Sequence, residues 1–419
     1  MTIKKSPKIK IAIIGGGAAG MMLAAVLLEN KVDASIEIFE KNTILGKKVL
    51  ISGGGRCNVT TAINDQTKLL KNYYRGSRFL QHSQAAFPPN KVINWFEHKG
   101  IKLKTEKDLR VFPVSDNGEE VVQLFLNIFK DRLKIHYAEP VKDLFFDNTF
   151  NITTENSSYE FDYLVLTTGG NAYAQTGSSG DGYMLAAKLG HTITQLGPSL
   201  NSFETSEAWI KELPGISLPN VSINYDDNPE RINGPLIFTH FGISGPVVFS
   251  LSSRLAFAKI SKLTPQKIVI RVEEKHDFQY WEDKLIIAIK NNPQKQILNL
   301  ISEYLPKNLV KQFLLILKID LQKQVNILLK TERRDLCHFL AGFTLNLVAR
   351  RAGDEFVTAG GLDLNEISSK TLRSKINPNL YFAGEILNYD GITGGFNLQG
   401  AWATAYNAAL AITKEILNS

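Results

Sequence analysis

Residues 53–58 read GGGRCN and set a cation, a thiol and an amide side by side behind three glycines. Consecutive glycines cost backbone entropy, so they predict a backbone that passes close to a ligand, with an ordinary surface turn as the alternative. Lys48 and Arg56 bring positive charge to this stretch. Because neighbouring cations stabilise a thiolate, we expect a lowered pKa for Cys57 and a capacity for nucleophilic or redox chemistry.

A second glycine pattern, G-x-G-x-x-G, is formed by Gly15, Gly17 and Gly20. In a dinucleotide-binding turn the first glycine allows the tight turn, the second lets pyrophosphate approach the backbone, and the third lets the helix pack on the strand. The N-terminus of the helix that follows favours the anion. These three glycines are therefore predicted to bind the pyrophosphate of a dinucleotide.

The elements around this turn support the same interpretation. Residues 9–14 are a β-branched run typical of a buried strand, residues 18–30 are an apolar helix, and residues 34–40 are a second strand that ends in Glu40. Together they make a βαβ unit of about thirty residues. Glu40 stands twenty residues beyond Gly20, where an acidic side chain accepts hydrogen bonds from ribose hydroxyls.

The C-terminal region indicates which dinucleotide is bound. No second fingerprint is present, because the TTGG at 167–170 follows a strand without opening a helix. In folds that bind FAD, a late strand such as YFAGEI brings residues like Gly384 and Glu385 to the ribityl and phosphate groups, and a glycine loop such as 394–401 offers a helix N-terminus to the isoalloxazine. The sequence thus predicts FAD as the resident cofactor, with NADH or NADPH limited to the role of a transient donor.

Two further side chains are candidates for proton transfer at a flavin. His240 lies among glycines in FTHFGISGP, and Tyr389 precedes the C-terminal glycine loop. Either side chain can supply a proton during hydride transfer, with a structural role in a turn as the alternative for His240. For Cys57 the alternative is a small packed residue. The spacing of His, Cys and carboxylate residues gives no metal site, and no G-x-S-x-G is present, so metal and triad chemistry are not expected.

Changes in composition divide the chain into three predicted parts. Residues 1–195 and 345–419 form a discontinuous FAD-binding domain, residues 196–275 and 335–345 form a β-rich domain, and residues 276–334 form a Leu-, Ile- and Lys-rich helical subdomain. The predicted fold class is therefore α/β, with a Rossmann-like FAD-binding domain interrupted by a β-plus-helical insert.

The cysteine count, the N-terminal sequence and the distribution of charge limit further which class of protein this can be. Among 419 residues there are only two cysteines, Cys57 and Cys337, so a disulfide framework is excluded and a reducing cytoplasm is expected. The basic N-terminus and the apolar run after it imitate a signal peptide, but the glycines at 15–17 are a turn inside too short a run, so neither a leader nor a membrane helix is predicted. Residues 254–334 carry sixteen Lys or Arg against eight Asp or Glu, which indicates an anionic partner or, more simply, a solvated helical face.

Four motifs follow one another over nearly the whole chain: GGGAAGMMLA, GKKVLISGGGRCNVT, FTHFGISGP and AGEILNYDGITGGFNLQGAWAT. In this order they resemble the bacterial flavoproteins similar to aminoacetone oxidase and bile-acid reductase, a group of NAD(P)/FAD-dependent oxidoreductases. The resemblance implies a discontinuous FAD domain, an inserted β-barrel-like domain and a small helical cap. The chain departs from this group at Gly400, where a bulky aromatic side chain is usual. The residue patterns and the resemblance together give these cofactor-binding residues: Gly15, Gly17, Ala18, Ala19, Gly20, Glu40, Lys41, Gly46, Lys48, Ser52, Gly53, Gly54, Arg56, Cys57, Asn58, Val141, Thr168, Gly169, Gly170, Asp181, Gly384, Glu385, Gly394, Gly395, Phe396, Asn397 and Leu398.

The predicted function is that of an oxidoreductase that passes hydride between non-covalently bound FAD and a small organic substrate. The resemblance implies reduction of a conjugated C=C bond or a ketone, or oxidation of an amine. In this interpretation the glycines of residues 53–58 lie against the cofactor, Lys48 and Arg56 stabilise reduced flavin or clamp pyrophosphate, and the Asn58 amide meets the ring edge.

Two alternatives stand beside this function. One is a non-enzymatic redox sensor that binds FAD, with Cys57 as the sensing residue. The other is an RNA-modifying flavoenzyme, which the basic segment would suit. The same segment lacks the interleaved aromatic residues that stack on bases, so nucleic acid is not expected as a partner.

Overall fold

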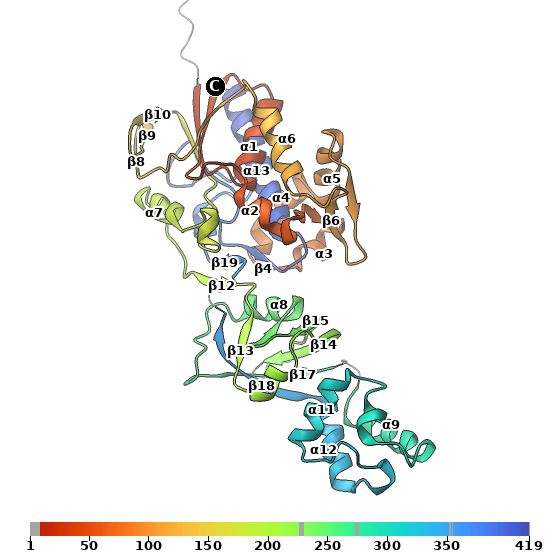
Figure 1. Cartoon of the computed structure of the whole chain (residues 1–419). Helices are drawn as coiled ribbons and strands as arrows, with labels where there is room; N and C mark the ends of the chain where they lie inside the picture. The colour runs from red at the N-terminus through yellow and green to blue at the C-terminus, as the bar shows by residue number, and fades with distance from the viewer. Residues whose placement is uncertain (1–8, 226–229, 273–275, 352, 354, 419) are drawn as a thin grey trace, which may run out of the picture. The chain divides into compact units, whose positions relative to one another are not determined.

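The computed structural model describes residues 9–225, 230–272, 276–351, 353 and 355–418, and the chain divides into two compact units. Unit 1 comprises Met1–Ser199 and Phe356–Ser419, and unit 2 comprises Leu200–Glu355. The chain enters unit 2 once and returns once, so unit 2 is an insertion into a discontinuous unit 1 (Figure 1).

A five-stranded parallel sheet is the centre of unit 1. Its strands, in spatial order, are β20 (Leu380–Phe382), β11 (Tyr163–Leu166), β1 (Ile9–Ile14), β2 (Ala34–Phe39) and β7 (Lys134–His136). Ile11 of β1 pairs with Ile36 on one side and with Tyr163 on the other, and all three side chains are buried. Burial on both faces is the reason that these strands are β-branched and aromatic runs without polar alternation.

Helices cover one side of this sheet and a smaller sheet covers the other (Figure 1). Helices α6 (Glu119–Phe129) and α13 (Phe396–Asn418) pack against α1 (Ala18–Glu29). The antiparallel strands β8 (Asp143–Asp147), β9 (Thr149–Thr153) and β10 (Ser158–Phe161) contact β1 and β11. Because α1 is enclosed in this way, its residues 19–27 are all buried and it is apolar all round.

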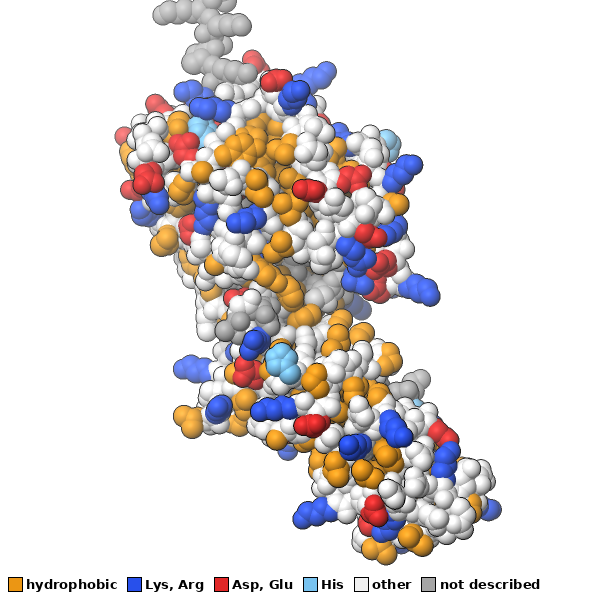
Figure 2. All heavy atoms as spheres, viewed as in Figure 1, with side chains coloured by type: hydrophobic (Ala, Val, Ile, Leu, Met, Phe, Trp, Pro, Cys, Tyr) orange, Lys and Arg blue, Asp and Glu red, His pale blue; other side chains and the backbone are white. Residues whose placement is uncertain are grey.

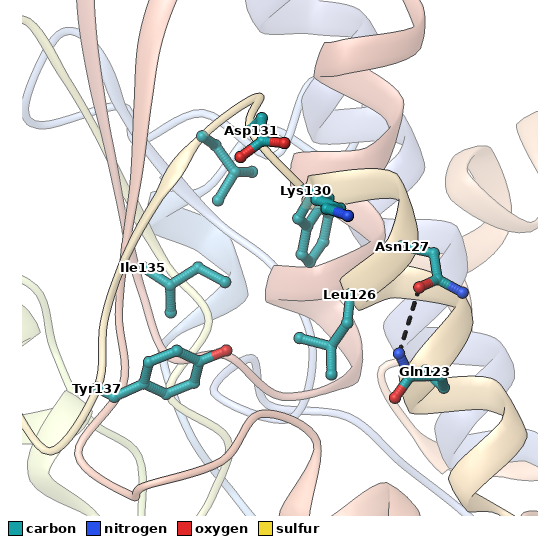
Figure 3. Close-up of a pocket in the computed structure, with 9 residues that line it drawn as sticks. Gln123, Leu126, Asn127, Lys130, Asp131, Ile135 and Tyr137 are labelled. Atoms are coloured by element: carbon teal, nitrogen blue, oxygen red, sulfur yellow. Dashed lines mark hydrogen bonds between the residues drawn. The ribbon is translucent and has the colours of Figure 1, made fainter.

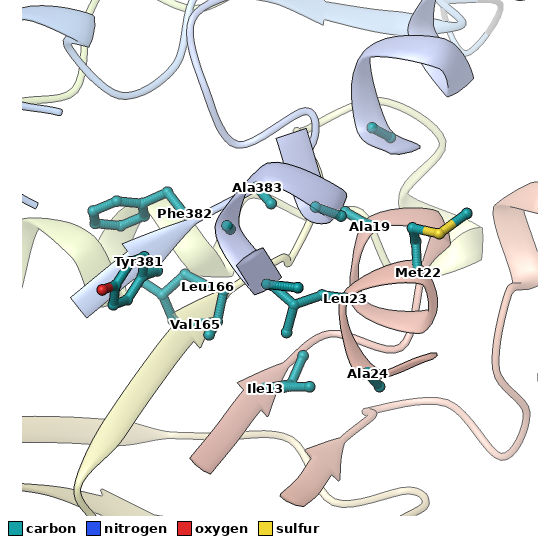
Figure 4. Close-up of a cluster of buried hydrophobic side chains, with 14 of the residues drawn as sticks. Ile13, Ala19, Met22, Leu23, Ala24, Val165, Leu166, Tyr381, Phe382 and Ala383 are labelled. Carbon is teal, nitrogen blue, oxygen red and sulfur yellow. The ribbon is translucent and has the colours of Figure 1, made fainter. Parts of the chain in front are cut away.

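Close packing brings α1 to the carboxyl ends of the strands. Leu23 of α1 lies near Ile13 of β1 and Leu166 of β11 (Figure 4), and none of these three side chains has exposed surface. Ala19 and Ala383 face each other where α1 meets the end of β20, and their small side chains permit the approach (Figure 4). The start of α1 is thereby held at the edge of the sheet where the strands end.

The remaining elements of unit 1 connect these layers. The helices are α2 (Lys47–Ile51), α3 (Gln66–Leu70), α4 (Ser77–Ala86), α5 (Pro89–His98) and α7 (Asp181–Lys188). The small sheets are β3 (Thr60–Thr61) with β6 (Arg110–Pro113) and β5 (Leu103–Thr105), β4 (Tyr73–Arg75) with β21 (Asp390–Gly391), and β12 (Gly197–Ser199) with β19 (Val357–Ala359).

Unit 2 contains a closed barrel and a group of helices. The barrel strands, in spatial order, are β13 (Phe203–Thr205), β16 (Gly242–Ser244), β15 (Ile232–Phe238), β14 (Ser217–Tyr225), β17 (Gln266–Arg271) and β18 (Phe343–Arg350). The helices are α8 (Pro246–Arg254), α9 (Phe278–Asn291), α10 (Ile297–Ile301), α11 (Lys307–Ile316) and α12 (Lys330–Ala341). None of the helices in the described part of the chain has the length and apolar character that a membrane span requires.

Two predicted boundaries differ from the structure. Residues 335–341, predicted to be β-rich, belong to α12, because Leu336, Cys337 and Leu340 recur at helical spacing and are buried. The return to the FAD-binding domain, predicted at residue 345, lies at Phe356. Strand β18 keeps its inward alternation and pairs with β13 and β17, so these residues close the barrel.

Candidate cofactor site

The turn between β1 and α1 has the geometry that its glycine spacing predicts. Gly15 has a φ of 105°, and an added Cβ there would lie 2.6 Å from the Thr167 carbonyl oxygen. An added Cβ on Gly20 would lie 2.0 Å from the Gly15 carbonyl oxygen, so helix and strand can approach only because this residue is glycine. At Gly17 no atom lies within 4 Å of an added Cβ. No side chain caps α1 and its first turn holds no acid, so the helix N-terminus beside Gly17 can receive an anion.

Glu40 holds this turn in place. Its Oε2 accepts a hydrogen bond of 2.9 Å from the Gly16 N–H, and its Oε1 accepts bonds of 2.8 Å and 2.7 Å from the backbone and side-chain N–H groups of Asn42. The residue is buried, with 7% of its surface exposed. Oε1 accepts two bonds and Oε2 only one, so Oε2 keeps one lone pair that can accept from a ribose hydroxyl.

Three further predicted residues connect segments that are distant in sequence to the turn between β1 and α1. They are Lys41, Gly46 and Asp181. The Lys41 ammonium donates to the Ser179 hydroxyl and lies 2.6 Å from an Asp181 carboxylate oxygen at the start of α7. The Gly46 N–H donates to the Gly16 carbonyl at 2.9 Å, and the positive φ of 66° at Gly46 turns the chain into α2. These three predicted residues therefore lie around the fingerprint turn.

The three glycines of residues 53–58 share a left-handed conformation. The φ angles of Gly53, Gly54 and Gly55 are 58°, 71° and 88°, values that favour glycine. At Gly54 nothing lies within 4 Å of an added Cβ. Ser52, just before them, donates its hydroxyl to the Val49 carbonyl at 2.8 Å. Gly54 thus presents bare backbone beside open space, whereas an added Cβ on Gly53 would lie 2.9 Å from the Asn58 backbone nitrogen.

Arg56 is directed toward acidic residues of its own chain. Its Nη1 lies 2.7 Å from Glu106 Oε1 and 3.5 Å from Asp116 Oδ1, and its guanidinium carbon lies 3.9 Å from the centroid of the Phe112 ring. Two carboxylates compensate its charge. The predicted contact of Arg56 with phosphate or flavin stays a prediction.

Asn58 ties residues 53–58 to the C-terminal glycine loop. With its amide oriented to satisfy both ends, the side-chain oxygen accepts from the Gly395 N–H at 2.9 Å and the nitrogen donates to the Thr60 carbonyl at 3.0 Å. Segments that are far apart in sequence are thereby joined at one place. The amide is engaged by the protein backbone, and its predicted contact with a flavin edge stays a prediction.

The expected lowering of the Cys57 pKa is wrong in direction. The thiol has no exposed surface, and burial raises the pKa of Cys57 to about 12. The neighbouring cations form ion pairs with carboxylates, Lys48 with Glu385 and Arg56 with Glu106. The structure therefore shows Cys57 as a packed thiol, the alternative considered from the sequence.

The C-terminal return meets the fingerprint helix. Gly384, in the turn after β20, has a φ of 82°, and an added Cβ there would lie 2.8 Å from the Ala19 Cβ. The next residue, Glu385, forms an ion pair with Lys48 of α2 across 2.8 Å. Residues predicted separately from the two ends of the chain are thus brought together beside Ala18 and Ala19, the first residues of α1.

The C-terminal glycine loop leads directly into α13. Gly394 and Gly395 have φ angles of 133° and 89°. Phe396, Asn397 and Leu398 occupy the first turn of the helix, and the Asn397 amide bridges the N–H and carbonyl groups of Gly391, both at 2.8 Å. The loop is therefore fixed from both sides.

Tyr389 is enclosed beneath this loop. It is 1% exposed, its hydroxyl has no hydrogen-bond partner among the described residues, and burial raises the pKa of Tyr389. Its ring fills the space beside Gly400, where an added Cβ would lie 2.7 Å from the Tyr389 Cε2. This packing leaves no room for a larger side chain at residue 400, and the catalytic role of Tyr389 stays a prediction.

The other predicted residues lie in separate places. His240 is an exposed residue of unit 2, between β15 and β16, and its ring centroid lies 5.0 Å from that of Phe241. Val141 is partly buried in the segment after β7. Thr168, Gly169 and Gly170 follow β11 at the carboxyl edge of the sheet. The catalytic role of His240 stays a prediction.

The residues of unit 1 fit a dinucleotide cofactor. Open space adjoins Gly17 and Gly54, and the helix N-terminus at Gly17 carries no side-chain cap. The Thr168 and Tyr183 hydroxyls are buried without a hydrogen-bond partner among the described residues. These features lie near the carboxyl ends of parallel strands, where sheets of this kind bind dinucleotides.

A separate hollow of about 410 Å³ lies at the C-terminal end of α6 (Figure 3). Leu126 and Tyr137 contribute to its lining, and Gln123 donates to the Asn127 side chain at 3.2 Å on its rim. It includes none of the predicted site residues. Within the described ranges, no three His, Cys, Asp or Glu side chains gather as a metal site would need.

Sequence reasoning missed two polar groups at this edge of unit 1. Arg75 Nε and Nη2 donate to the two carboxylate oxygens of Asp390 at 2.5 Å and 2.6 Å, and the Ser199 hydroxyl donates to the same carboxylate at 2.8 Å. Thr358 contacts both Asn171 and Glu385. In the sequence, only the aspartate of YDGITGG, Asp390, indicated the first group. No sequence pattern indicated the group around Thr358.

The family model described as HI0933-like protein Rossmann domain matches residues 9–411. The chain is 27% identical to the 3-dehydro-bile acid delta(4,6)-reductase of Clostridium scindens, over 96% of this chain and 98% of the relative. It is 29% identical to the ribosomal RNA dihydrouridine synthase of Haemophilus influenzae, over 96% and 98%. In fold it is similar to the 3-ketosteroid delta1-dehydrogenase of Sterolibacterium denitrificans, with a TM-score of 0.50, 12% identity, and coverage of 97% of this chain and 99% of that one.

Proposed function

This chain belongs to the HI0933-like family, and on that premise we propose that it reduces a C=C bond conjugated to a carbonyl group by hydride transfer from FAD. The predicted family resemblance, the Rossmann-type α/β fold and the enzyme class, an FAD-dependent oxidoreductase, are confirmed. The names of both relatives describe saturation of a ring C=C bond conjugated to a carbonyl, which supports this reaction class.

The observation that carries the proposal is the open, uncapped turn at Gly17 with the buried Glu40 beside it. In the proposed complex, the N–H groups of this turn bind the pyrophosphate, Glu40 binds the ribose, and the Lys48–Glu385 pair lies near the ribityl chain. The bare backbone of Gly53 and Gly54 lies against the ring. FAD, when bound, supplies the acceptor and donor of hydride.

The first test is an anaerobic titration of the purified protein with NADH and then NADPH, followed by the flavin absorbance. We expect one donor to bleach the flavin, and an added α,β-unsaturated ketone, but not its saturated counterpart, to restore the absorbance. Absence of bound FAD would contradict the cofactor. Flavin that neither donor reduces would contradict the reductase and point to a substrate that gives up hydride to the flavin and is itself oxidised.

Saturation of the bond also needs a proton, and we propose His240 as its donor. The variant His240→Gln is expected to slow reoxidation of reduced flavin by the unsaturated ketone about 100-fold. Reduction by NADH or NADPH is expected to stay unchanged in that variant. Equal slowing of both half-reactions would show that His240 serves the fold and not the proton transfer.

A second candidate is the same reaction on a uracil base within RNA. It is favoured by an aromatic and cationic group in the helical part of unit 2. Lys284 Nζ lies 4.9 Å from the Tyr280 ring centroid and 4.2 Å from that of Tyr304, and the His276 ring stacks on Tyr280 at 3.7 Å. On the face seen in Figure 2, Lys and Arg side chains are interspersed with hydrophobic ones.

RNA binding is tested by titrating labelled ribosomal RNA fragments at increasing salt. If RNA is the substrate, the affinity falls steeply with salt, because phosphate contacts release counterions. Lys284→Ala should then weaken binding, while Lys188→Ala, which removes an exposed cation of unit 1, should not. Affinity that does not depend on salt or on Lys284 would exclude this candidate. The redox-sensor alternative loses its sensing residue, because Cys57 is buried.

A further inference from the structure

Thr358 lies in a closed ring of polar contacts beside the proposed cofactor residues. Its hydroxyl oxygen accepts a hydrogen bond of 2.6 Å from the Asn171 N–H, and its own N–H donates to Glu385 Oε1 at 2.9 Å. Glu385 Oε2 in turn lies 2.8 Å from Lys48 Nζ, which donates to the Ala172 carbonyl at 3.3 Å. The ring thus joins β19, the loop after β11, α2 and the turn after β20.

The two contacts of Glu385 fix its carboxylate. Each oxygen has its own partner, the Thr358 N–H on one and the Lys48 ammonium on the other. A carboxylate held at both oxygens cannot rotate freely, so its negative charge stays at a set distance from Lys48. The side chains of Lys48 and Glu385 are 28% and 17% exposed, so the surrounding protein strengthens this interaction relative to one in water.

The loop after β11 rests directly on Thr358. An added Cβ on Gly170 would lie 2.5 Å from the Thr358 hydroxyl oxygen and 2.8 Å from Glu385 Oε1. Thr358 itself is 3% exposed. Loss of its hydroxyl would therefore leave the Asn171 N–H without its acceptor in a closely packed place.

We propose that Thr358 is a positioning residue for FAD: its hydroxyl fixes the loop of residues 170–172, whose Ala172 carbonyl accepts from Lys48, and so sets how much of the Lys48 charge reaches the flavin. This inference rests on the proposed function, because it takes Lys48, Gly170 and Glu385 as cofactor contacts. Thr358 also belongs to β19, the strand on which the chain returns from unit 2.

The test compares Thr358→Val, Thr358→Ser and a matched control, Thr413→Val. Valine keeps the shape and the backbone N–H of Thr358 and removes only the hydroxyl, while serine keeps the hydroxyl. Thr413 is also buried in unit 1, 8% exposed, and its hydroxyl donates to the Ala409 carbonyl at 2.8 Å within α13. The readouts are the dissociation constant for FAD, the midpoint potential of bound FAD and the melting temperature without FAD.

We expect Thr358→Val to weaken FAD binding about tenfold and to shift the midpoint potential, as loss of one hydrogen bond to a buried donor implies. Thr358→Ser should restore both values, and Thr413→Val should change neither. Unchanged affinity and potential in Thr358→Val would overturn the inference while FAD binding by the unaltered protein upholds the proposed function. An unaltered protein that binds no FAD would overturn both.

Discussion

The Gly16 N–H and the Glu40 carboxylate share a buried hydrogen bond of 2.9 Å that spans 24 positions of sequence. The acid proposed to bind the ribose therefore also fixes the turn proposed to bind the pyrophosphate. A substitution at Glu40 acts on both groups of the cofactor at once. Alanine and glutamine at position 40 should differ in how strongly they disturb the turn and the binding of the ribose.

Glu40→Ala should lower the free energy of unfolding by about 2–3 kcal/mol, because three hydrogen bonds to one carboxylate are lost. It should also leave the purified protein without FAD. Glu40→Gln keeps one oxygen acceptor and should retain more of both properties. The measurements are urea unfolding and the flavin absorbance per polypeptide, and full FAD occupancy in Glu40→Ala would refute the assignment.

Gly17 and Gly20 should respond in opposite ways to alanine. An added Cβ at Gly17 meets no atom within 4 Å, so Gly17→Ala should fold normally yet weaken FAD binding tenfold or more, because the methyl group enters the space of the pyrophosphate. An added Cβ at Gly20 would lie 2.0 Å from a backbone oxygen, so Gly20→Ala should lower the melting temperature even without FAD. Thermal unfolding of the FAD-free proteins and FAD titration distinguish the two. Equal losses in both variants would contradict the separate roles.

Removal of one partner of the Arg75–Asp390 ion pair is predicted to lower the free energy of unfolding strongly. The Asp390 side chain has no exposed surface and that of Arg75 is 15% exposed. Asp390→Ala should therefore cost about 3–5 kcal/mol of unfolding free energy, because a buried cation loses its counterion. The matched control is Asp143→Ala, which removes the partner of Lys188 from a pair with both side chains more than half exposed, at 57% and 51%. Urea unfolding should show little change there, and a similar loss in both variants would contradict the role of burial.

The Cys57 thiol should be unreactive in the folded protein. At pH 8 a thiol reagent should modify neither Cys57 nor the equally buried Cys337 until urea unfolds the chain. Because the Cys57 pKa is raised from 9.0 to about 12, the stability contributed by this thiol is fully present below pH 9 and is lost as pH rises toward 12. Unfolding free energies across this range should fall less steeply in Cys57→Ala. Rapid modification of the folded protein would revive the redox-sensor alternative.

The sequence predicted the parts of the site that are encoded locally. A β-branched strand, a glycine turn and an apolar helix follow one another within β1 and α1, and the acid at the end of β2 occurs at a fixed distance from them. The three left-handed glycines before Arg56 are likewise visible as a run. In these cases the residues that require a particular backbone conformation are neighbours in sequence. Their spacing alone is therefore enough to predict that conformation.

The missed features depend on partners that are distant in sequence or on burial. Arg75 and Asp390 are 315 positions apart, and Thr358 is 187 positions from Asn171. Adjacent cations in the sequence suggested a reactive Cys57, but those cations pair with carboxylates and the thiol is enclosed. The boundary at Phe356 was missed because β18 belongs to the barrel only through its pairing with β13 and β17, whose residues are distant in sequence.

The pairing of β12 with β19 has a consequence for how the chain tolerates its insertion. Ser199 and Val357 are register partners, so the chain leaves and re-enters unit 1 at adjacent positions of one antiparallel ladder. For unit 1, everything between these residues is a single hairpin loop, and the entropy of closing a loop grows only with the logarithm of its length, by about 0.6 kcal/mol for each doubling. The stability of unit 1 thus depends little on the size of the inserted domain. A related chain can exchange that domain for a larger or smaller one without rebuilding unit 1.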